Sequence, residues 1–177
     1  MSGKISKVTQ AMQASAETEV TAGTNNQYMT FELAGEAYGI DILKVREIKG
    51  WEPVREIPNT PPFIRGVLDL RGTLVPIVDL RERFGMETVE YTPVTVVIVL
   101  SVLGSEDGNE RVMGIVADGV SDVLDVKPET IKQAPNLGTQ IDTRYMKGMV
   151  MGEQMVMLLD ADKLLDPAEF SVLGDIG

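Results

Sequence analysis

The amino-acid sequence predicts an all-β fold in which two small five-stranded β-barrels pack together, with a few short helices. Three observations predict it. From Tyr28 onward, short apolar runs alternate with turn residues, a pattern typical of barrels built from many short strands. The pattern of the first half recurs in the second half. Each half is too small to bury a sizeable core alone, so the two units are expected to pack against each other.

Composition supports a folded core and excludes several kinds of chemistry. The chain has 177 residues, of which 44% are hydrophobic but only 5% aromatic, so Val, Ile, Leu and Met are expected to form the core. It contains no cysteine and no histidine. Disulfides, thiolate nucleophiles, Cys-type zinc sites, imidazole ligands and His-dependent catalytic triads are therefore excluded.

The charge is acidic and unevenly distributed. Sixteen basic and 27 acidic residues give a net charge of −11, which argues against non-specific nucleic-acid binding. Residues 87–177 hold 6 basic and 16 acidic side chains, which predicts a solvated acidic face there. The N-terminus lacks the apolar region of a signal peptide, and no stretch approaches the length of a membrane span. The chain is therefore predicted to be soluble and cytoplasmic.

The chain divides into a leader, a folded region and a tail. Residues 1–27 are rich in Ser, Thr, Ala, Gln and Asn, which predicts a mostly disordered leader. The folded region is expected over 28–166, and residues 167–177 are expected to form a tail. Within it, a first unit over 28–86 and a second over 93–166 are expected, and exchange of strands between the two units is left open.

The first unit shows strand and turn signals in order. The expected strands are residues 29–33, 38–40, 64–70 and 73–80. Asp41 is expected to cap a short helical stretch that continues through Val45 and Ile48. Four prolines between positions 53 and 62 predict an extended link, and Arg71-Gly72 predicts a hairpin turn.

The second unit repeats these signals. A near-continuous apolar run at 94–102 and a strand at 111–117 flank a turn around Asp107-Gly108. Sequence matches between the units lie 75 positions apart near Gly39 and Gly114, and about 82 apart near Gly66 and Gly148. Asp160 is expected to cap a short closing helix, which Pro167 ends. The methionines of the last hairpin either fill a barrel interior or form an adaptable binding surface; they are Met149, Met151, Met155 and Met157.

Enzymatic and metal-binding motifs are weak. Asp160, Asp162 and Asp166 have some similarity to a calcium loop, but the glycine and the distal glutamate of an EF-hand are missing. No Walker A or GxGxxG motif occurs, so no phosphate-binding loop is predicted. We therefore expect no enzyme activity, no cofactor and no metal. An acidic β-barrel enzyme acting on carbohydrate is kept as the alternative class.

The most specific pattern in the chain runs from Ile64 to Gly85. Its sequence is Ile-Arg-Gly-Val-Leu-Asp-Leu-Arg-Gly-Thr-Leu-Val-Pro-Ile-Val-Asp-Leu-Arg-Glu-Arg-Phe-Gly. With residues 38–48 and 57–61, this block resembles the CheW family of chemotaxis coupling proteins, and the resemblance covers residues 28–166. It implies two SH3-like five-stranded barrels around a joint core. It also implies a non-catalytic adaptor that couples chemoreceptors (methyl-accepting chemotaxis proteins) to the histidine kinase CheA.

The resemblance further implies two binding surfaces. A groove between the barrels is expected to accept the apolar tip of the receptor's helical hairpin, and an Arg71–Glu47 ion pair is expected to shape its wall. The expected receptor-binding residues are Val45, Glu47, Gly66, Leu68 and Arg71. The regulatory domain of CheA is expected to dock on the first barrel, at Glu52, Val54, Ile57 and Arg65. For Val45 and Leu68, burial in the barrel core is the alternative to facing the receptor.

Other expectations concern assembly and pathway. Coupling proteins of this kind are expected to contact one another in arrays and to meet the membrane only indirectly, through receptors at its inner face. Asp69 stands where many family members have Asn, which adds charge near the groove. A coupling role in a non-flagellar pathway, such as motility by pili, is the alternative to swimming chemotaxis.

Overall fold

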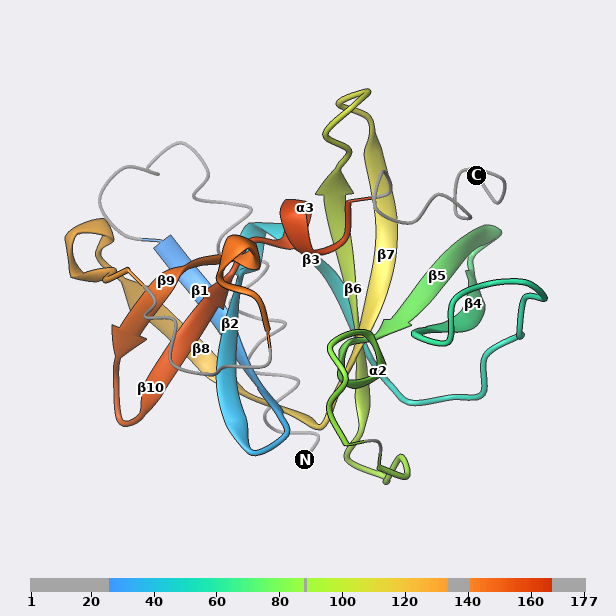
Figure 1. The fold of residues 1–177 in the computed structure, drawn as a ribbon, viewed down its shortest axis with the longest axis horizontal. Coiled ribbons are helices and arrows are strands. Elements are labelled where there is room, and N and C mark those ends of the chain that lie inside the picture. The colour runs from blue at the N-terminus through green and yellow to red at the C-terminus, as the bar shows by residue number, and fades with distance from the viewer. Residues whose placement is uncertain (1–25, 88, 134–140, 167–177) are drawn as a thin grey trace.

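The computed structural model describes residues 26–87, 89–133 and 141–166, which form two five-stranded sheets lying side by side (Figure 1). The first sheet contains, in order, β8 (Gly119–Val126), β1 (Asn26–Leu33), β2 (Glu36–Asp41), β10 (Met155–Leu159) and β9 (Met146–Met151). The second contains β3 (Val45–Gly50), β6 (Val96–Leu103), β7 (Glu110–Ala117), β5 (Thr73–Asp79) and β4 (Ile64–Leu70). The short helices are η2 (Ile42–Lys44), α2 (Leu80–Arg83), η3 (Pro128–Thr130), η4 (Thr143–Tyr145) and α3 (Ala161–Leu164). The predicted all-β fold is confirmed.

Each sheet takes strands from both repeats. β1 and β2 of the first repeat join β8, β9 and β10 of the second, whereas β6 and β7 of the second repeat join β3, β4 and β5 of the first. The exchange creates the two parallel contacts, β2 with β10 and β5 with β7. The two sequence units, 28–86 and 93–166, therefore do not correspond to the two sheets.

The N-terminal boundary and one helix differ from the expectation. Asn26 and Gln27, assigned to the leader, begin β1 opposite Val126 and Asp125. The rest of the expected leader and the tail lie outside the described residues. Asp41 caps η2 by accepting a hydrogen bond from the Leu43 amide at 3.0 Å, but the helix ends at Lys44.

The predicted continuation of that helix through Val45 and Ile48 is wrong. These β-branched and apolar side chains pair with Leu100 and Ile98 of β6 instead. Sheet pairing with the buried strand β6 therefore outweighs the helical spacing that the sequence suggested.

The two repeats end alike. Asp79 caps α2 by accepting from the Arg81 amide at 2.9 Å, and Asp160 caps α3 by accepting from the Lys163 amide at 3.2 Å. The predicted cap at Asp160 is confirmed. Figure 1 shows α3 at the junction between the two sheets. Among the described helices, none is long and apolar enough to cross a membrane.

The core formed by the described residues has three parts. The largest joins the two sheets and includes Met29 and Phe31 of β1 together with Ile98 and Leu100 of β6, all 2% exposed or less. A smaller cluster lies inside each sheet's barrel. Because the largest cluster draws on both sheets, the two barrels are expected to depend on each other for stability.

Candidate functional site

The structure brings most of the expected receptor-binding residues into the second sheet. Glu47 of β3 and Gly66 of β4 lie on one row across the sheet. The strand register links them through one residue on each strand between them, namely Val99 of β6, Gly114 of β7 and Ile77 of β5. Val45 and Leu68 each lie two residues from that row, on the same strands as Glu47 and Gly66. Arg71 lies in the turn that ends β4.

Gly66 allows the chain to close the second barrel. Its φ is +147°, and the register of β4 shifts beside it. A Cβ atom at this position would lie 2.3 Å from the carbonyl oxygen of Arg55. Arg55 and Val67 exchange two backbone hydrogen bonds, of 3.0 and 2.9 Å. The missing side chain therefore makes room for the chain's own segment around Arg55.

The second repeat has the same feature at Gly148. Its φ is +149°, and a Cβ atom there would lie 2.5 Å from the carbonyl oxygen of Lys132. Lys132 and Met149 exchange backbone hydrogen bonds of 2.9 and 2.8 Å. Two equivalent glycines with equivalent contacts indicate that this position serves the architecture of each barrel.

Val45 and Leu68 are buried. Val45 is 6% exposed in the core that joins the sheets, and Leu68 is 4% exposed in the core of the second barrel. The core alternative left open by the sequence is therefore the one found in this structure.

Arg71 and Glu47 do not form the expected ion pair in the part of the chain that the structure describes, so that expectation is wrong. Arg71 is exposed in the hairpin turn with a φ of +55°. Asp69 stabilises this turn, because its carboxylate accepts a hydrogen bond from the Gly72 amide at 2.8 Å. Glu47 is half-buried on β3. Arg71 is thus available to a partner rather than to Glu47.

Exposed leucines near β3 were missed by the sequence reasoning. Leu43 is 59% exposed and Leu103 is 46% exposed. Asp162 connects their surroundings, because it pairs with Lys44 at 2.9 Å and accepts from the Leu103 amide at the same distance. The sequence did not indicate that Leu43 is exposed, because the longer helix expected there gave no reason to distinguish it from its buried neighbours.

A charged network flanks these leucines. Arg46 of β3 donates to Glu110 of β7, and the Ser101 hydroxyl of β6 donates to the same carboxylate. These contacts, the Ser101 hydrogen bond first and then Arg46, lower the pKa of Glu110. The network holds β3 against the β6–β7 hairpin at the end of the sheet where Leu103 lies.

The expected kinase-binding residues lie together on and beside the link between β3 and β4, which belong to the first sequence unit but, because of the strand exchange, to the second sheet. Glu52 is exposed, with its carboxylate 3.6 Å from Lys49 Nζ, while Val54 and Ile57 are half-buried. Arg65 is exposed on β4, and its guanidinium lies 5.6 Å from the centre of the Tyr91 ring.

A cleft of about 450 Å³ lies beside Arg65. It is lined by Arg65, Asp79, Glu82, Val89, Glu90 and Tyr91. The Tyr91 hydroxyl donates to Asp79 at 2.7 Å, and its ring lies 4.1 Å from that of Trp51. Burial raises the pKa of Tyr91, and the hydrogen bond to Asp79 raises it further. The cleft wall is thus a fixed aromatic and carboxylate unit.

The aspartates that suggested a calcium loop have structural contacts. Asp160 caps α3, Asp162 pairs with Lys44, and Asp166 accepts from the Ser105 amide at 3.4 Å. No group of three or more acidic side chains suited to a metal ion occurs within residues 26–87, 89–133 and 141–166.

Comparison with known proteins identifies the family. A family model described as CheW-like domain matches residues 27–169. The chain is 46% identical over 151 residues to the chemotaxis protein CheW of Klebsiella aerogenes, covering 85% of this chain and 87% of that protein. It is 29% identical over 145 residues to CheW of Bacillus subtilis, covering 81% and 88%. The crystal structure of the scaffolding protein TtCheW from Thermoanaerobacter tengcongensis matches with a TM-score of 0.70 at 29% identity, covering 81% of this chain and 90% of that one. The chain belongs to the CheW-like domain family.

Proposed function

We propose that this protein is a non-catalytic adaptor of chemotaxis, which couples chemoreceptors to the histidine kinase CheA. The observation that carries the proposal is the 46% identity to a chemotaxis protein CheW over most of both chains. The description of TtCheW as a scaffolding protein supports the adaptor role. Its place is at the inner face of the membrane, which it reaches through receptors, alongside CheA and other coupling proteins.

The receptor surface combines expected and newly found residues. Arg71 and Glu47 offer charge on opposite edges of the second sheet, and exposed Leu43 and Leu103 offer apolar area. Val45 and Leu68 are buried in two different cores and Gly66 packs against the Arg55 backbone, so these three residues contribute by holding β3 and β4 in place. An apolar helical hairpin gains free energy by covering exposed leucines, and flanking charges fix its orientation.

The kinase surface is the segment with Glu52, Val54 and Ile57 together with Arg65. Val54 packs on the second barrel's core and still reaches the surface, as a residue at the rim of an interface does. The neighbouring cleft places Arg65 beside Glu82 and Glu90. Mixed charge next to a partly exposed apolar segment suits docking of a folded domain.

The test is a kinase assay with receptor fragments in membranes, CheA, and this protein added or omitted. Autophosphorylation should rise only when all three are present, and attractant should suppress the rise. Absence of binding to both components would overturn the adaptor role.

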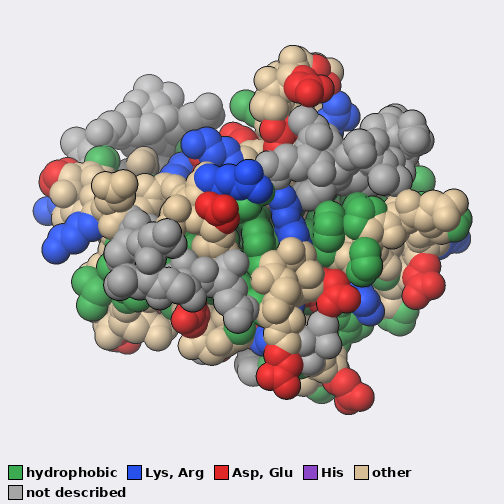
Figure 2. All heavy atoms as spheres, viewed as in Figure 1, with side chains coloured by type: hydrophobic (Ala, Val, Ile, Leu, Met, Phe, Trp, Pro, Cys, Tyr) green, Lys and Arg blue, Asp and Glu red, His purple; other side chains and the backbone are tan. Residues whose placement is uncertain are grey.

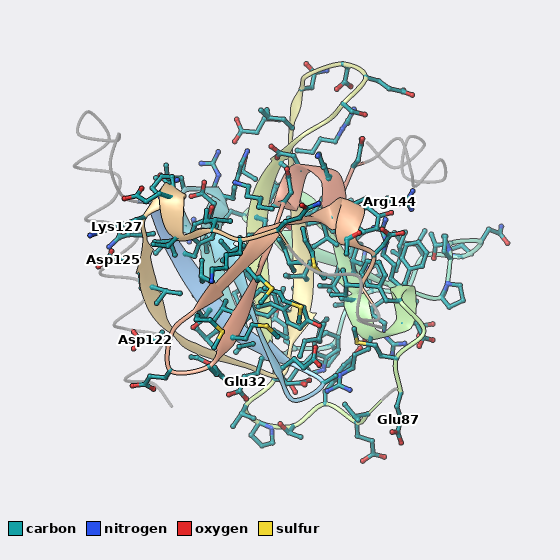
Figure 3. All side chains as sticks on the ribbon, turned by 60° about the vertical axis from the view of Figure 1, so that its left-hand side comes forward. Glu32, Glu87, Asp122, Asp125, Lys127 and Arg144 are labelled. Carbon is teal, nitrogen blue, oxygen red and sulfur yellow. The ribbon has the colours of Figure 1, made fainter. Side chains whose placement is uncertain are left out.

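Two variants test the receptor surface. Arg71→Ala and Leu43→Asp should each reduce receptor binding and the kinase response, because they remove a reachable charge and an exposed apolar side chain. Lys127→Ala is the matched control, since Lys127 lies with Asp125 at the outer edge of the first sheet, on β8's side (Figure 3). The free energy of unfolding of each test variant should lie within about 0.5 kcal/mol of the value for the unsubstituted protein, as is usual for substitutions at exposed positions. Receptor binding equal to that of Lys127→Ala would remove these residues from the site.

A further inference from the structure

The β9–β10 hairpin carries four methionines on one face. Strand register pairs Met151 with Met155 near the turn and Met149 with Met157 one step further in. Successive residues of a strand alternate between faces, so these four share a face while Val150 and Val156 point into the first barrel. We call them the methionine ladder, with Met151 and Met155 as the outer pair and Met149 and Met157 as the inner pair.

The ladder runs from solvent into the joint core. In the outer pair, Met151 is 69% exposed and Met155 is 43% exposed. In the inner pair, Met149 is half-buried and Met157 is only 4% exposed, within the core that joins the two sheets. Figure 2 shows hydrophobic side chains at the surface near the tip of this hairpin, at the lower left. The exposed thioethers of the outer pair thus lie next to the less exposed inner pair along the two strands, on the solvent side.

Methionine is the only sulfur-containing residue type in this chain. The sequence has ten methionines and no cysteine, so no thiol competes for a two-electron oxidant. A hydroperoxide converts a thioether to a sulfoxide: the sulfur lone pair attacks one peroxide oxygen, an S–O bond forms and the O–O bond breaks. The sulfur loses two electrons, and the leaving oxygen takes up the proton released by the newly sulfur-bound hydroxyl, so hydrogen peroxide leaves as water and an organic hydroperoxide leaves as an alcohol. The sulfoxide is polar and chiral where the thioether was apolar.

We infer that the methionine ladder is a hydroperoxide-modification site that is oxidised in order, from the outer pair at the hairpin tip to the inner pair at the joint core. Oxidation of the outer pair makes the hairpin tip more polar and weakens its cross-strand contact. The inner pair then becomes accessible through local opening of the hairpin. Oxidation of Met157 places a sulfoxide in the core shared by both sheets, so the damage reaches the whole fold only at the second stage.

The experiment treats the full chain with hydrogen peroxide and follows each methionine by peptide mass spectrometry. The outer pair should be oxidised first, and Met157 about tenfold or more slowly, because an opening that costs about 1.4 kcal/mol already gives that factor. The midpoint temperature of thermal unfolding should change little when the outer pair is oxidised and should fall when the inner pair is oxidised. Methionine sulfoxide reductases should restore it.

A double variant tests the order. Met151→Leu with Met155→Leu keeps an apolar cover but removes the first oxidation step, so the inner pair should be oxidised several-fold more slowly than in the unsubstituted protein. Met86→Leu is the control, because Met86 is a buried methionine elsewhere in the joint core. An unchanged rate for Met149 and Met157 in the double variant, or oxidation of Met157 as fast as Met151, overturns the inference.

Discussion

Substitution of Gly66 tests whether this glycine serves the barrel or the partner. In Gly66→Ala, the new Cβ atom would lie 2.3 Å from the Arg55 carbonyl oxygen, far inside van der Waals contact. The contact is with backbone, which cannot rotate away as a side chain can. The φ of +147° adds strain for any residue with a side chain.

The expected cost follows from these contacts. Backbone strain contributes about 1–3 kcal/mol, and loss of the two hydrogen bonds between Arg55 and Val67 contributes about 1 kcal/mol each. Gly66→Ala should therefore destabilise the protein by about 3–5 kcal/mol. Gly72→Ala is the matched control, since Gly72 also has a positive φ, +87°, but open space around it. It should cost only about 1–2 kcal/mol.

Urea unfolding, followed by circular dichroism, measures the difference. With an m-value of about 2 kcal/mol per molar, the midpoint should fall by about 1.5–2.5 M for Gly66→Ala and by less than about 1 M for Gly72→Ala. Gly148→Ala should behave like Gly66→Ala, because its Cβ would lie 2.5 Å from the Lys132 carbonyl oxygen. Equal shifts for Gly66→Ala and Gly72→Ala would refute the closing role assigned to Gly66. A confirmed large shift would mean that receptor-binding defects of Gly66 variants must be corrected for unfolding.

Two further predictions concern the junction and alkaline pH. Arg81 donates to Asp118 and to the Glu87 carbonyl, and its side chain is only 11% exposed. Arg81→Met should lower the free energy of unfolding, measured in urea, by about 2–3 kcal/mol, because the Asp118 carboxylate loses its cation. The control Lys127→Met should change this free energy little. Folding raises the pKa of Tyr91, first through burial and then through the hydrogen bond to Asp79. The free energy of unfolding should therefore be unaffected by this group below about pH 10, where the phenol of the unfolded chain titrates, and should fall as the pH rises further. In Tyr91→Phe this alkaline loss should be smaller, and a pH-stability profile as steep as that of the unsubstituted protein would contradict the assignment.

The sequence predicted the fold class because its signals were local and repeated. The Arg71-Gly72 turn, the Asp160 cap and the strands of the hairpin at 64–80 all depend on residues that are neighbours in the chain. The exchange of strands between repeats was left open, because pairing of β1 with β8 depends on contacts about 90 residues apart. Alternating apolar residues indicate a strand but do not name its partner.

The candidate site was predicted less completely. Val45 and Leu68 were expected to face either a groove or the core, and apolar strand residues look the same in sequence for both. Arg71 was matched with Glu47 by charge alone, whereas a φ of +55° and an exposed turn are properties of the folded backbone. Exposed Leu43 was missed because its exposure depends on where η2 ends.

Strand exchange also constrains how this protein can be made. During synthesis β1 and β2 leave the ribosome first, yet their sheet neighbours β8 and β10 begin only at Gly119 and Met155. Nearly the whole chain must therefore be synthesised before the first sheet can close. Long-range pairing of this kind slows folding and leaves strand edges exposed in the meantime. Nascent chains stopped before residue 155 should resist protease poorly, and protection should appear abruptly near the end of translation rather than one barrel at a time.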